Sequence, residues 1–378
     1  MAQSGTWKPP QDFITVSITQ KNGDYDNSKD RRKRSCYRVD LGNRLLPCFT
    51  SQSGIPFSDV NLQTHQAHPP KWGPDSSVSE VSTIQLEFRD LTFLTKNQEY
   101  KNAVDKVMQQ LHNLPKRSGL VPMFINAQTG NFRQGATITL GARADSYYEY
   151  LLKQWLQTGK TEDWLKNDFI SAMDGVISLL SRRSEPNKLL YVGELLHGTS
   201  FSPKMDHLVC FLPGVMALAA HNGLGDKYMK FAKDMVETCY QMYTRMPSHL
   251  SPEIAYFNEH AEQSEDIIVK PLDAHNLLRP ETVESLYIMY QITKDKKYQE
   301  YGWKIFQAFE QHTRIPHGGY SSLNNVKELS HGYRDKMESF FLGETLKYLF
   351  LLFSDVEIVP LDKFVFNTEA HPLPIRQQ

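Results

Sequence analysis

The 378 residues are 40% hydrophobic, enough for a large buried core, and carry a formal net charge of −1. So small a charge provides neither the basic field that attracts nucleic acid nor a polybasic signal for membrane surfaces. No apolar run approaches the roughly 18–20 residues that cross a bilayer, so we expect no membrane span and no nucleic-acid partner.

The N-terminal 39 residues differ from the rest of the chain. They contain Pro9-Pro10 and the basic run Arg31-Arg32-Lys33-Arg34, and they show no helical period. We expect residues 1–39 to form a disordered tail with a solvated basic run. Residues 40–378 then form the folded part, which opens with a loop region rich in Pro, Ser and Gly up to residue 78.

From residue 80 onward the chain repeats one pattern: an apolar helix, a polar turn, an aromatic residue and an amphipathic helix. The turns fall near residues 95–97, 158–160, 222–223 and 293–295, and the aromatic residues that follow them are Tyr100, Trp164, Tyr228 and Tyr298. A last helix is expected over residues 337–353. Each repeat predicts an αα-hairpin with a buried inner helix and an outer helix that has a polar face. The fold class is therefore all-α, and both an α/α barrel and a superhelix fit the pattern.

Acidic side chains lie at or near the start of each inner helix. They are Glu80, Asp145, Asp206 (followed by His207) and the pair Glu281 and Glu284. If the inner helices run parallel, these acids meet at one end of the barrel, which is costly unless they bind something. Pro280 suits a first helical turn, so Glu281 and Glu284 fit either a solvated helix cap or acids at the rim of a cavity. Acids, aromatics and loop formers around a cup favour a sugar ligand.

Four cysteines are present, and none forms a CxxC metal or redox pattern. Cys210 and Cys239 lie in consecutive helical segments that could pack antiparallel. A disulfide and two buried thiols fit this spacing equally well.

Five segments, in order along the chain, strongly resemble class I α1,2-mannosidases, glycoside hydrolase family 47, and within it the members of the endoplasmic reticulum. They are Gly141-Ala142-Arg143-Ala144-Asp145-Ser146-Tyr147-Tyr148-Glu149-Tyr150, Lys204-Met205-Asp206-His207-Leu208, Arg279-Pro280-Glu281-Thr282-Val283-Glu284-Ser285, Asp335-Lys336-Met337-Glu338-Ser339-Phe340 and Asn367-Thr368-Glu369-Ala370-His371-Pro372. The resemblance covers about residues 40–375. It implies an (αα)7 barrel with one Ca2+ ion and inverting hydrolysis of terminal α1,2-linked mannose on the high-mannose N-glycans of glycoproteins. It also implies a location in the endoplasmic reticulum or Golgi, in the lumen or at the membrane.

The resemblance also implies roles for single residues. Asp145 and Glu281 match two of the family's essential carboxylates; Glu281 is our choice for the general base that activates water, and Asp145 is the second candidate. Thr368 matches the calcium ligand, and Glu369 a position in the shell behind it. Sugar-contacting or calcium-shell positions are matched by Glu80, Arg143, His207, Arg279, Glu284, Phe340 and Glu344. Cys210 and Cys239 match the family's disulfide.

One departure from the family pattern concerns the general acid. Family members carry a proton-donating Glu in an early Glu-Ser-Thr-Ile-Arg-like motif, upstream of the segment matched here by residues 40–45, and this sequence has no such motif. Residues 1–39 supply neither that acid, nor the first barrel helices, nor the family's membrane anchor. We therefore expect a barrel without its first helices and a mannosidase impaired in catalysis.

Two other hypotheses belong to different functional classes. A glycan-binding, lectin-like protein of the same fold, acting in glycoprotein quality control, would keep Arg279, Phe340 and Thr368 without the acid. A plain helical-repeat scaffold is the third hypothesis. The Arg279-Pro280-Glu281 and Asn367-Thr368-Glu369 segments argue against it, because a scaffold would end its inner helices in exchangeable polar residues.

Overall fold

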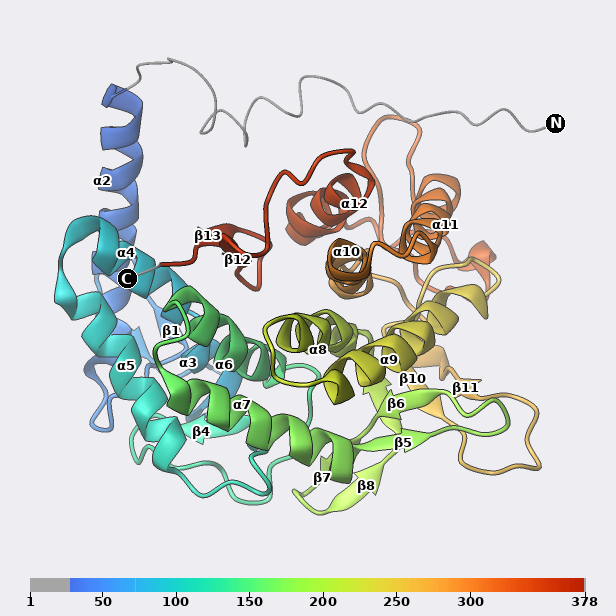
Figure 1. The fold of residues 1–378 in the computed structure, drawn as a ribbon, viewed down its shortest axis with the longest axis horizontal. Coiled ribbons are helices and arrows are strands. Elements are labelled where there is room, and N and C mark those ends of the chain that lie inside the picture. Colours follow the sequence, from blue (N-terminus) through green and yellow to red (C-terminus); the bar gives the residue numbers. More distant parts are fainter. Residues whose placement is uncertain (1–27, 72, 377–378) are drawn as a thin grey trace. The chain divides into compact units, whose positions relative to one another are not determined.

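The structure is a computed structural model that describes residues 28–71 and 73–376 (Figure 1). It divides into two compact units, residues 1–41 and residues 42–378, each of which is described by itself. Residues 1–27 of the predicted tail lie outside the described residues.

The described residues contain helices and short antiparallel strands. The helices are α2 (Ser28–Leu45), α3 (Val78–Ser82), α4 (Gln85–Thr95), α5 (Gln98–Asn113), α6 (Asp145–Gln157), α7 (Asp163–Gly175), α8 (Leu212–His221), α9 (Asp226–Thr244), α10 (Glu281–Thr293), α11 (Lys297–His312) and α12 (Leu346–Phe353). The strands pair as β1 (Asp59–Val60) with β2 (Ala67–His68), β3 (Asp75–Ser77) with β4 (Phe124–Asn126), β5 (Ser181–Arg183) with β6 (Leu190–Val192), β7 (Glu194–Leu196) with β8 (Ser200–Ser202), β10 (Ile254–Phe257) with both β9 (Lys204–Asp206) and β11 (Ile267–Ile268), and β12 (Phe364–Phe366) with β13 (Pro372–Pro374).

Helix α2 corrects one prediction, because it includes residues 28–39, which the sequence analysis placed in a disordered tail. The segment contains neither Pro nor Gly before Gly42, and Arg and Lys have high intrinsic helix propensities. The lack of an apolar period, on which the prediction relied, does not exclude a helix whose residues individually favour it. The basic run at residues 31–34 therefore lies within a helix.

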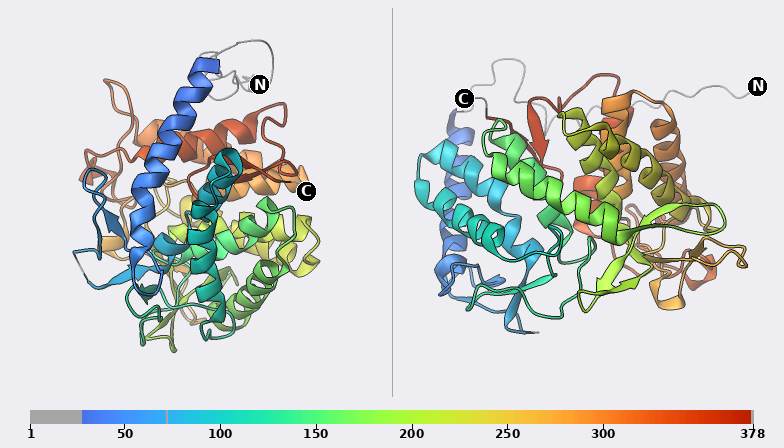
Figure 2. Two further views of the ribbon diagram at one scale, coloured as in Figure 1. Left: turned by 90° about the vertical axis from the view of Figure 1, so that its left-hand side faces the viewer. Right: turned by 60° about the horizontal axis from the view of Figure 1, so that its bottom comes forward.

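Within residues 42–378, the helices alternate between an inner and an outer layer (Figure 1). The inner helices α4, α6, α8, α10 and α12 pack each against the next, and α4, α6, α8 and α10 each pack on the outer helix that follows. The β12–β13 hairpin returns the chain to α6 and α4, and Figure 2 gives two further views of these layers. This ring is the predicted α/α barrel.

Three of the inner helices are buried on all sides, and of these α8 and α10 are apolar nearly all round whereas α6 also buries charged and amide side chains. Residues 146–157 of α6, 212–219 of α8 and 282–289 of α10 are all buried, whereas α9 and α11 bury one face only. The predicted turns are confirmed. Two of them use a left-handed residue directly after an inner helix, Lys96 with φ 65° and Lys294 with φ 57°, and this conformation satisfies the last helix carbonyls.

The last inner helix begins at Ser339, two residues later than the predicted residue 337. Just before it, residues 334 and 336 bond to Ser322 through their backbones, and Asp335 has φ 50°. A wider π-type turn over Phe341–Thr345 then leads into α12. Such turns are frequent at functional sites, and this one carries Glu344.

A disulfide joins Cys210, in the turn before α8, to Cys239 in α9, as the family resemblance implies. The two Cα atoms lie 5.9 Å apart and the two residues are 29 positions apart in sequence. The bond ties the segment that leads into an inner helix to the outer helix behind it.

We expect the Cys210→Ser variant to lose about 3–4 kcal/mol of unfolding free energy, because the disulfide closes a loop of this length in the unfolded chain. Urea unfolding with and without the substitution measures the loss. Cys48→Ser is the control, since Cys48 is a buried free thiol and its replacement opens no loop. A loss no larger than that of the control would contradict the prediction.

Candidate active site

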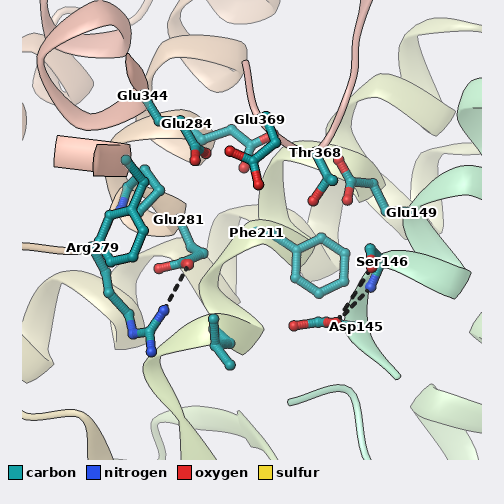
Figure 3. Close-up of a pocket in the computed structure, with 13 residues that line it drawn as sticks. Asp145, Ser146, Glu149, Phe211, Arg279, Glu281, Glu284, Glu344, Thr368 and Glu369 are labelled. Atoms are coloured by element: carbon teal, nitrogen blue, oxygen red, sulfur yellow. Dashed lines mark hydrogen bonds and ion pairs between the residues drawn. The ribbon is translucent and has the colours of Figure 1, made fainter. Parts of the chain in front are cut away.

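A pocket of about 160 Å³ lies where inner helices begin. Its wall comes from the starts of α6 and α10, the turns before α8 and α12, and the β12–β13 hairpin (Figure 3). The lining residues are Asp145, Ser146, Glu149, Leu208, Phe211, Arg279, Pro280, Glu281, Glu284, Phe340, Glu344, Thr368 and Glu369. Six carboxyl groups therefore share the wall with one guanidinium, so the pocket is strongly acidic.

Both helices that carry the predicted catalytic acids are entered through a left-handed residue. Arg143 has φ 78° two residues before Asp145, and Leu278 has φ 63° three residues before Glu281. This conformation is strained for a side chain as bulky as leucine. The buried Leu278 is held by two side chains, since its N–H donates to Asn276 (3.0 Å) and its carbonyl accepts from Thr345 (2.7 Å). The surroundings thus fix the point at which α10 begins.

Asp145 is the first residue of α6, and its Oδ1 accepts two short hydrogen bonds and a longer one. The short ones come from the hydroxyl of Ser79, at 2.7 Å, and the backbone N–H of Ser146, at 2.9 Å, and the longer one from the hydroxyl of Ser146, at 3.5 Å. Burial raises the pKa of Asp145 to about 6, and the nearby carboxylates of Glu149 and Glu281 add to the increase. The two short hydrogen bonds act in the opposite direction but do not cancel it.

Glu281 is the first residue of α10, and its surroundings favour the charged form. Oε2 lies 2.7 Å from Nδ1 of His207, and Oε1 lies 3.9 Å from the guanidinium of Arg279. Burial alone would raise the pKa of Glu281, but the hydrogen bond with His207 and the charge of Arg279 act against burial, and the pKa is lowered. Glu281 is therefore a carboxylate under conditions in which Asp145 still binds a proton.

Arg279 is fixed by a carboxylate and an aromatic ring. Its Nε donates to Glu253 at 2.6 Å, its second terminal nitrogen lies 2.5 Å from the same oxygen, and its Cζ lies 5.5 Å from the ring centre of Phe340. A charge-assisted pair of this kind holds the planar guanidinium in one orientation. Arg279 and Phe340 thus both line the pocket, and Figure 3 shows Glu281 beside Arg279.

Two of the glutamates share a buried lysine. Lys153 is 1% exposed, forms an ion pair with Glu149 one turn earlier in α6, and lies 3.6 Å from Glu284 of α10. Burial raises the pKa of Glu284 against the opposing effect of the Lys153 ammonium. Burial also lowers the pKa of Lys153, but the two carboxylates outweigh it and raise the pKa. Lys153 is therefore the counter-charge beneath this side of the pocket.

The third side of the pocket combines Glu344 with the loop of the β12–β13 hairpin. Burial, followed by the charges of Glu369 and Glu284, raises the pKa of Glu344 to about 9. The loop is held by Asn367, whose Oδ1 accepts from the backbone N–H groups of Glu369 (3.0 Å) and His371 (2.7 Å). This turn places Thr368 and Glu369 at the pocket wall.

Three residues for which the sequence predicts sugar or calcium contacts are outside the residues that line this pocket. Glu80 is exposed and completes a capping box with Ser77 at the start of α3. The exposed Arg143 places its Cζ 5.5 Å from the ring centre of Phe124. His207 is 2% exposed and lies behind Glu281.

Sequence reasoning missed other pocket residues, of which Glu149 is the most important. Its signal was available, because a residue four positions after Asp145 lies on the same face of a helix. Phe211 and Leu208 gave no such signal, since apolar residues before a buried helix are ordinary core residues. Asp206, noted as an acid before an inner helix, is instead buried and accepts from the N–H of Ala142 at 3.3 Å.

The sequence profile of glycosyl hydrolase family 47 matches residues 25–375. The chain belongs to this family. The human protein named endoplasmic reticulum mannosyl-oligosaccharide 1,2-alpha-mannosidase is 58% identical over 340 residues, an alignment that covers 89% of this chain and 48% of the human protein. The mannosyl-oligosaccharide 1,2-alpha-mannosidase of Candida albicans is 44% identical over 364 residues, covering 89% of this chain and 64% of that protein.

A solved structure of the same family supports the fold. The alpha-1,2-mannosidase from Trichoderma reesei superposes with a TM-score of 0.84 at 28% identity, covering 93% of this chain and 76% of the other. The family match begins at residue 25, so it includes a part of the segment that the sequence analysis treated as non-matching. The chain spans about half the length of the human relative.

Two further observations concern the described residues of this family 47 chain. None of their helices is both long and apolar enough to cross a membrane. Within the same part of the chain, no three His, Cys, Asp or Glu side chains are grouped so that they could hold a metal ion directly.

Proposed function

We propose that this chain carries the active site of a calcium-dependent, inverting exo-α1,2-mannosidase that removes terminal α1,2-linked mannose from high-mannose N-glycans. The relatives' names, the family match and the acidic pocket support this proposal. Because the human relative is named for the endoplasmic reticulum, we propose that compartment for this chain as well. The disulfide supports it, since disulfides persist in oxidising compartments.

The observation that carries the proposal is the contrast between Asp145 and Glu281. Both line one pocket, yet burial raises the pKa of Asp145 to about 6 whereas His207 and Arg279 lower the pKa of Glu281. Environments that push two carboxyl groups apart in this way are typical of acid–base catalysis. Near pH 6 Asp145 is partly protonated whereas Glu281 is ionised, so Glu281 is the better candidate to take the proton from the attacking water, with Asp145 as the second carboxyl.

The pocket wall fits a calcium ion on the chemistry of its donors. Calcium prefers oxygen ligands and accepts water among them, and the wall offers the hydroxyl and carbonyl of Thr368 beside Glu284, Glu344 and Glu369. The carboxyl groups of Glu284 and Glu344 have raised pKa values because they are buried near other carboxylates, a cost that a divalent cation would relieve. We assign Thr368 as the direct ligand and Glu369 to the shell behind it. When bound, the ion would orient sugar hydroxyls.

The test is mannose release from a high-mannose N-glycan by the purified chain, with calcium and with a chelator. We expect release that stops on chelation and returns when calcium is added back. A substrate with only α1,6-linked mannose is the control and should remain intact. Glycan binding without release would instead favour the lectin-like hypothesis, and release that is insensitive to the chelator would contradict the calcium assignment.

A further inference from the structure

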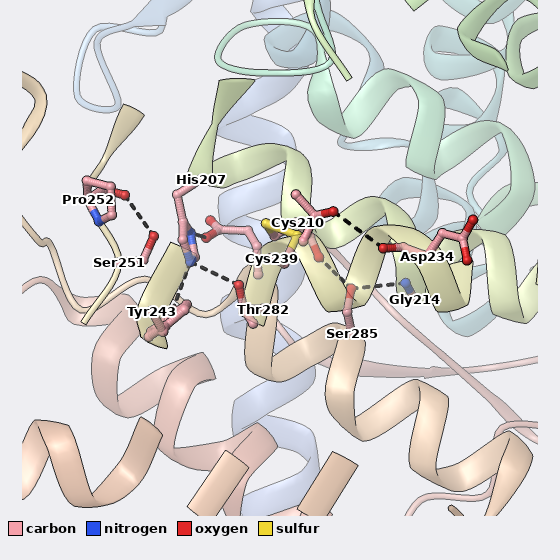
Figure 4. Close-up of a disulfide and its surroundings, with 12 residues drawn as sticks. His207, Cys210, Gly214, Asp234, Cys239, Tyr243, Ser251, Pro252, Thr282 and Ser285 are labelled. Carbon is pink, nitrogen blue, oxygen red and sulfur yellow. Dashed lines mark hydrogen bonds and ion pairs between the residues drawn. A yellow bond between two sulfur atoms is a disulfide. The ribbon is translucent and has the colours of Figure 1, made fainter. Parts of the chain in front are cut away.

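His207 is hydrogen-bonded on both ring nitrogens, although it is buried behind the pocket. Nδ1 lies 2.7 Å from Oε2 of Glu281. Nε2 lies 2.8 Å from the hydroxyl of Tyr243 and 3.0 Å from that of Thr282 (Figure 4). The ring of Tyr243 packs edge-on against the imidazole, with centroids 5.7 Å apart. Glu281 is thus connected through His207 to a residue on an outer helix.

The disulfide explains why α9 can supply this contact. Tyr243 and Cys239 are one turn apart in α9 and therefore lie on the same face of that helix. Cys239 is bonded to Cys210, which follows His207 in the same short turn. The covalent link therefore fixes the face of α9 that carries Tyr243 against the segment that carries His207 (Figure 4).

The partners of His207 determine where its proton lies. An ionised Glu281 only accepts hydrogen bonds, so a proton must be on Nδ1. In a neutral imidazole Nε2 is then an acceptor and needs a donor. Tyr243 can serve, because it is 1% exposed and burial raises its pKa far enough to keep the phenol protonated. Thr282 lies farther from Nε2 than Tyr243 does, and its hydroxyl can donate to the tyrosine oxygen instead.

We propose that Tyr243 is a positioning residue whose hydroxyl donates to Nε2 of His207 and thereby keeps the other ring proton on Nδ1, facing Glu281. The consequence for activity rests on the proposed function, in which Glu281 is the general base. A donor fixed on Nδ1 holds the carboxylate of Glu281 in one orientation and keeps it ionised. Tyr243 acts through His207 and does not itself line the pocket.

The first test is the tautomer of His207 in the intact chain. Nitrogen-15 NMR of histidine-labelled protein at pH 7 distinguishes a protonated from an unprotonated ring nitrogen, and a His207→Asn variant assigns the resonance by its loss among the 13 histidines. We expect a proton on Nδ1 and none on Nε2. A proton on Nε2, in the other neutral tautomer or in the imidazolium, would overturn the inference. This NMR measurement requires neither enzymatic turnover nor a variant of Tyr243.

The second test compares Tyr243→Phe with Tyr240→Phe. Tyr240 lies one turn earlier in α9 and stacks on Tyr301, so its variant loses the same hydroxyl away from His207. We expect Tyr243→Phe to move the Nε2 resonance and to lower kcat roughly tenfold at unchanged KM, the scale of one lost hydrogen bond. Tyr240→Phe should leave the Nε2 resonance, kcat and KM unchanged. An unmoved resonance in Tyr243→Phe, or a kcat equal to the parent's, would overturn the inference.

The two tests separate this inference from the proposed function. If the parent chain shows no turnover on any α1,2-linked mannoside, the proposed function fails while the resonance of His207 still decides the role of Tyr243. If the parent turns over and the tautomer is the wrong one, the inference alone fails.

Discussion

The Glu281→Gln variant is expected to lose about 10²–10⁴-fold in kcat, the usual contribution of a general base. Glutamine has the shape of glutamate and its carbonyl can still accept from His207, but it cannot take a proton from water. The pocket wall and the contact with Arg279 need little rearrangement. We therefore expect glycan binding, and hence KM, to stay within a fewfold of the parent's value.

Steady-state release of mannose measures this effect, and thermal unfolding shows whether the variant is folded. The matched control is Glu99→Gln, the same chemical change at an exposed residue in the first turn of α5. A Glu281→Gln variant that keeps a third or more of the parent's turnover would contradict the assignment of Glu281 as the general base. In that case Asp145→Asn becomes the decisive variant, because Asp145 is the other carboxyl group of the pair.

The repeat pattern predicted most of the barrel, because an inner helix that is apolar nearly all round must be buried wherever it lies. The turns at Lys96 and Lys294 could be predicted because they are local features of a few residues. The backbone pairing of residues 334 and 336 with Ser322, just before the last helix, could not be predicted, since these segments are close in space only after folding. Helix α2 was not predicted, because the prediction relied on an amphipathic period and this helix has none.

The site shows the same division between local and long-range information. Motif order singled out Asp145, Glu281 and Thr368, all of which line one pocket. Their protonation could not be predicted, because it follows from burial and from partners far away in sequence. His207 illustrates this best. Its motif indicated sugar contact, whereas the structure places it behind Glu281 with Tyr243 on its other side. No spacing rule connects these three residues.

Replacing Lys153 with methionine is expected to destabilise the chain by about 3–5 kcal/mol, because it leaves buried carboxylates without their counter-charge. Methionine fills the volume of the lysine stem, so the loss comes from charge and not from a cavity. Glu149 is 3% exposed and Glu284 7% exposed, so neither can turn to bulk solvent. Urea unfolding at pH 7 measures the change, with calcium chelated so that no cation substitutes for the ammonium.

The same variant has a predicted pH dependence. Burial already raises the pKa of Glu284 in the presence of Lys153, and loss of the ammonium raises it further. The folded state then binds more protons than the unfolded state above the ordinary pKa of glutamate, so unfolding free energy falls as pH rises. We therefore expect a larger deficit at pH 8 than at pH 5.

Two further variants serve as controls for the predicted effect of Lys153→Met. Lys227→Met removes a lysine whose ion pair with Asp174 is about half exposed on both sides, and such pairs contribute at most about 1 kcal/mol. The double variant Glu149→Gln/Lys153→Met should recover a part of the loss, because glutamine at position 149 needs no counter-charge. A deficit in Lys153→Met that equals that of Lys227→Met, or one that shrinks toward pH 8, would show that Lys153 is not the counter-charge of these buried carboxyl groups.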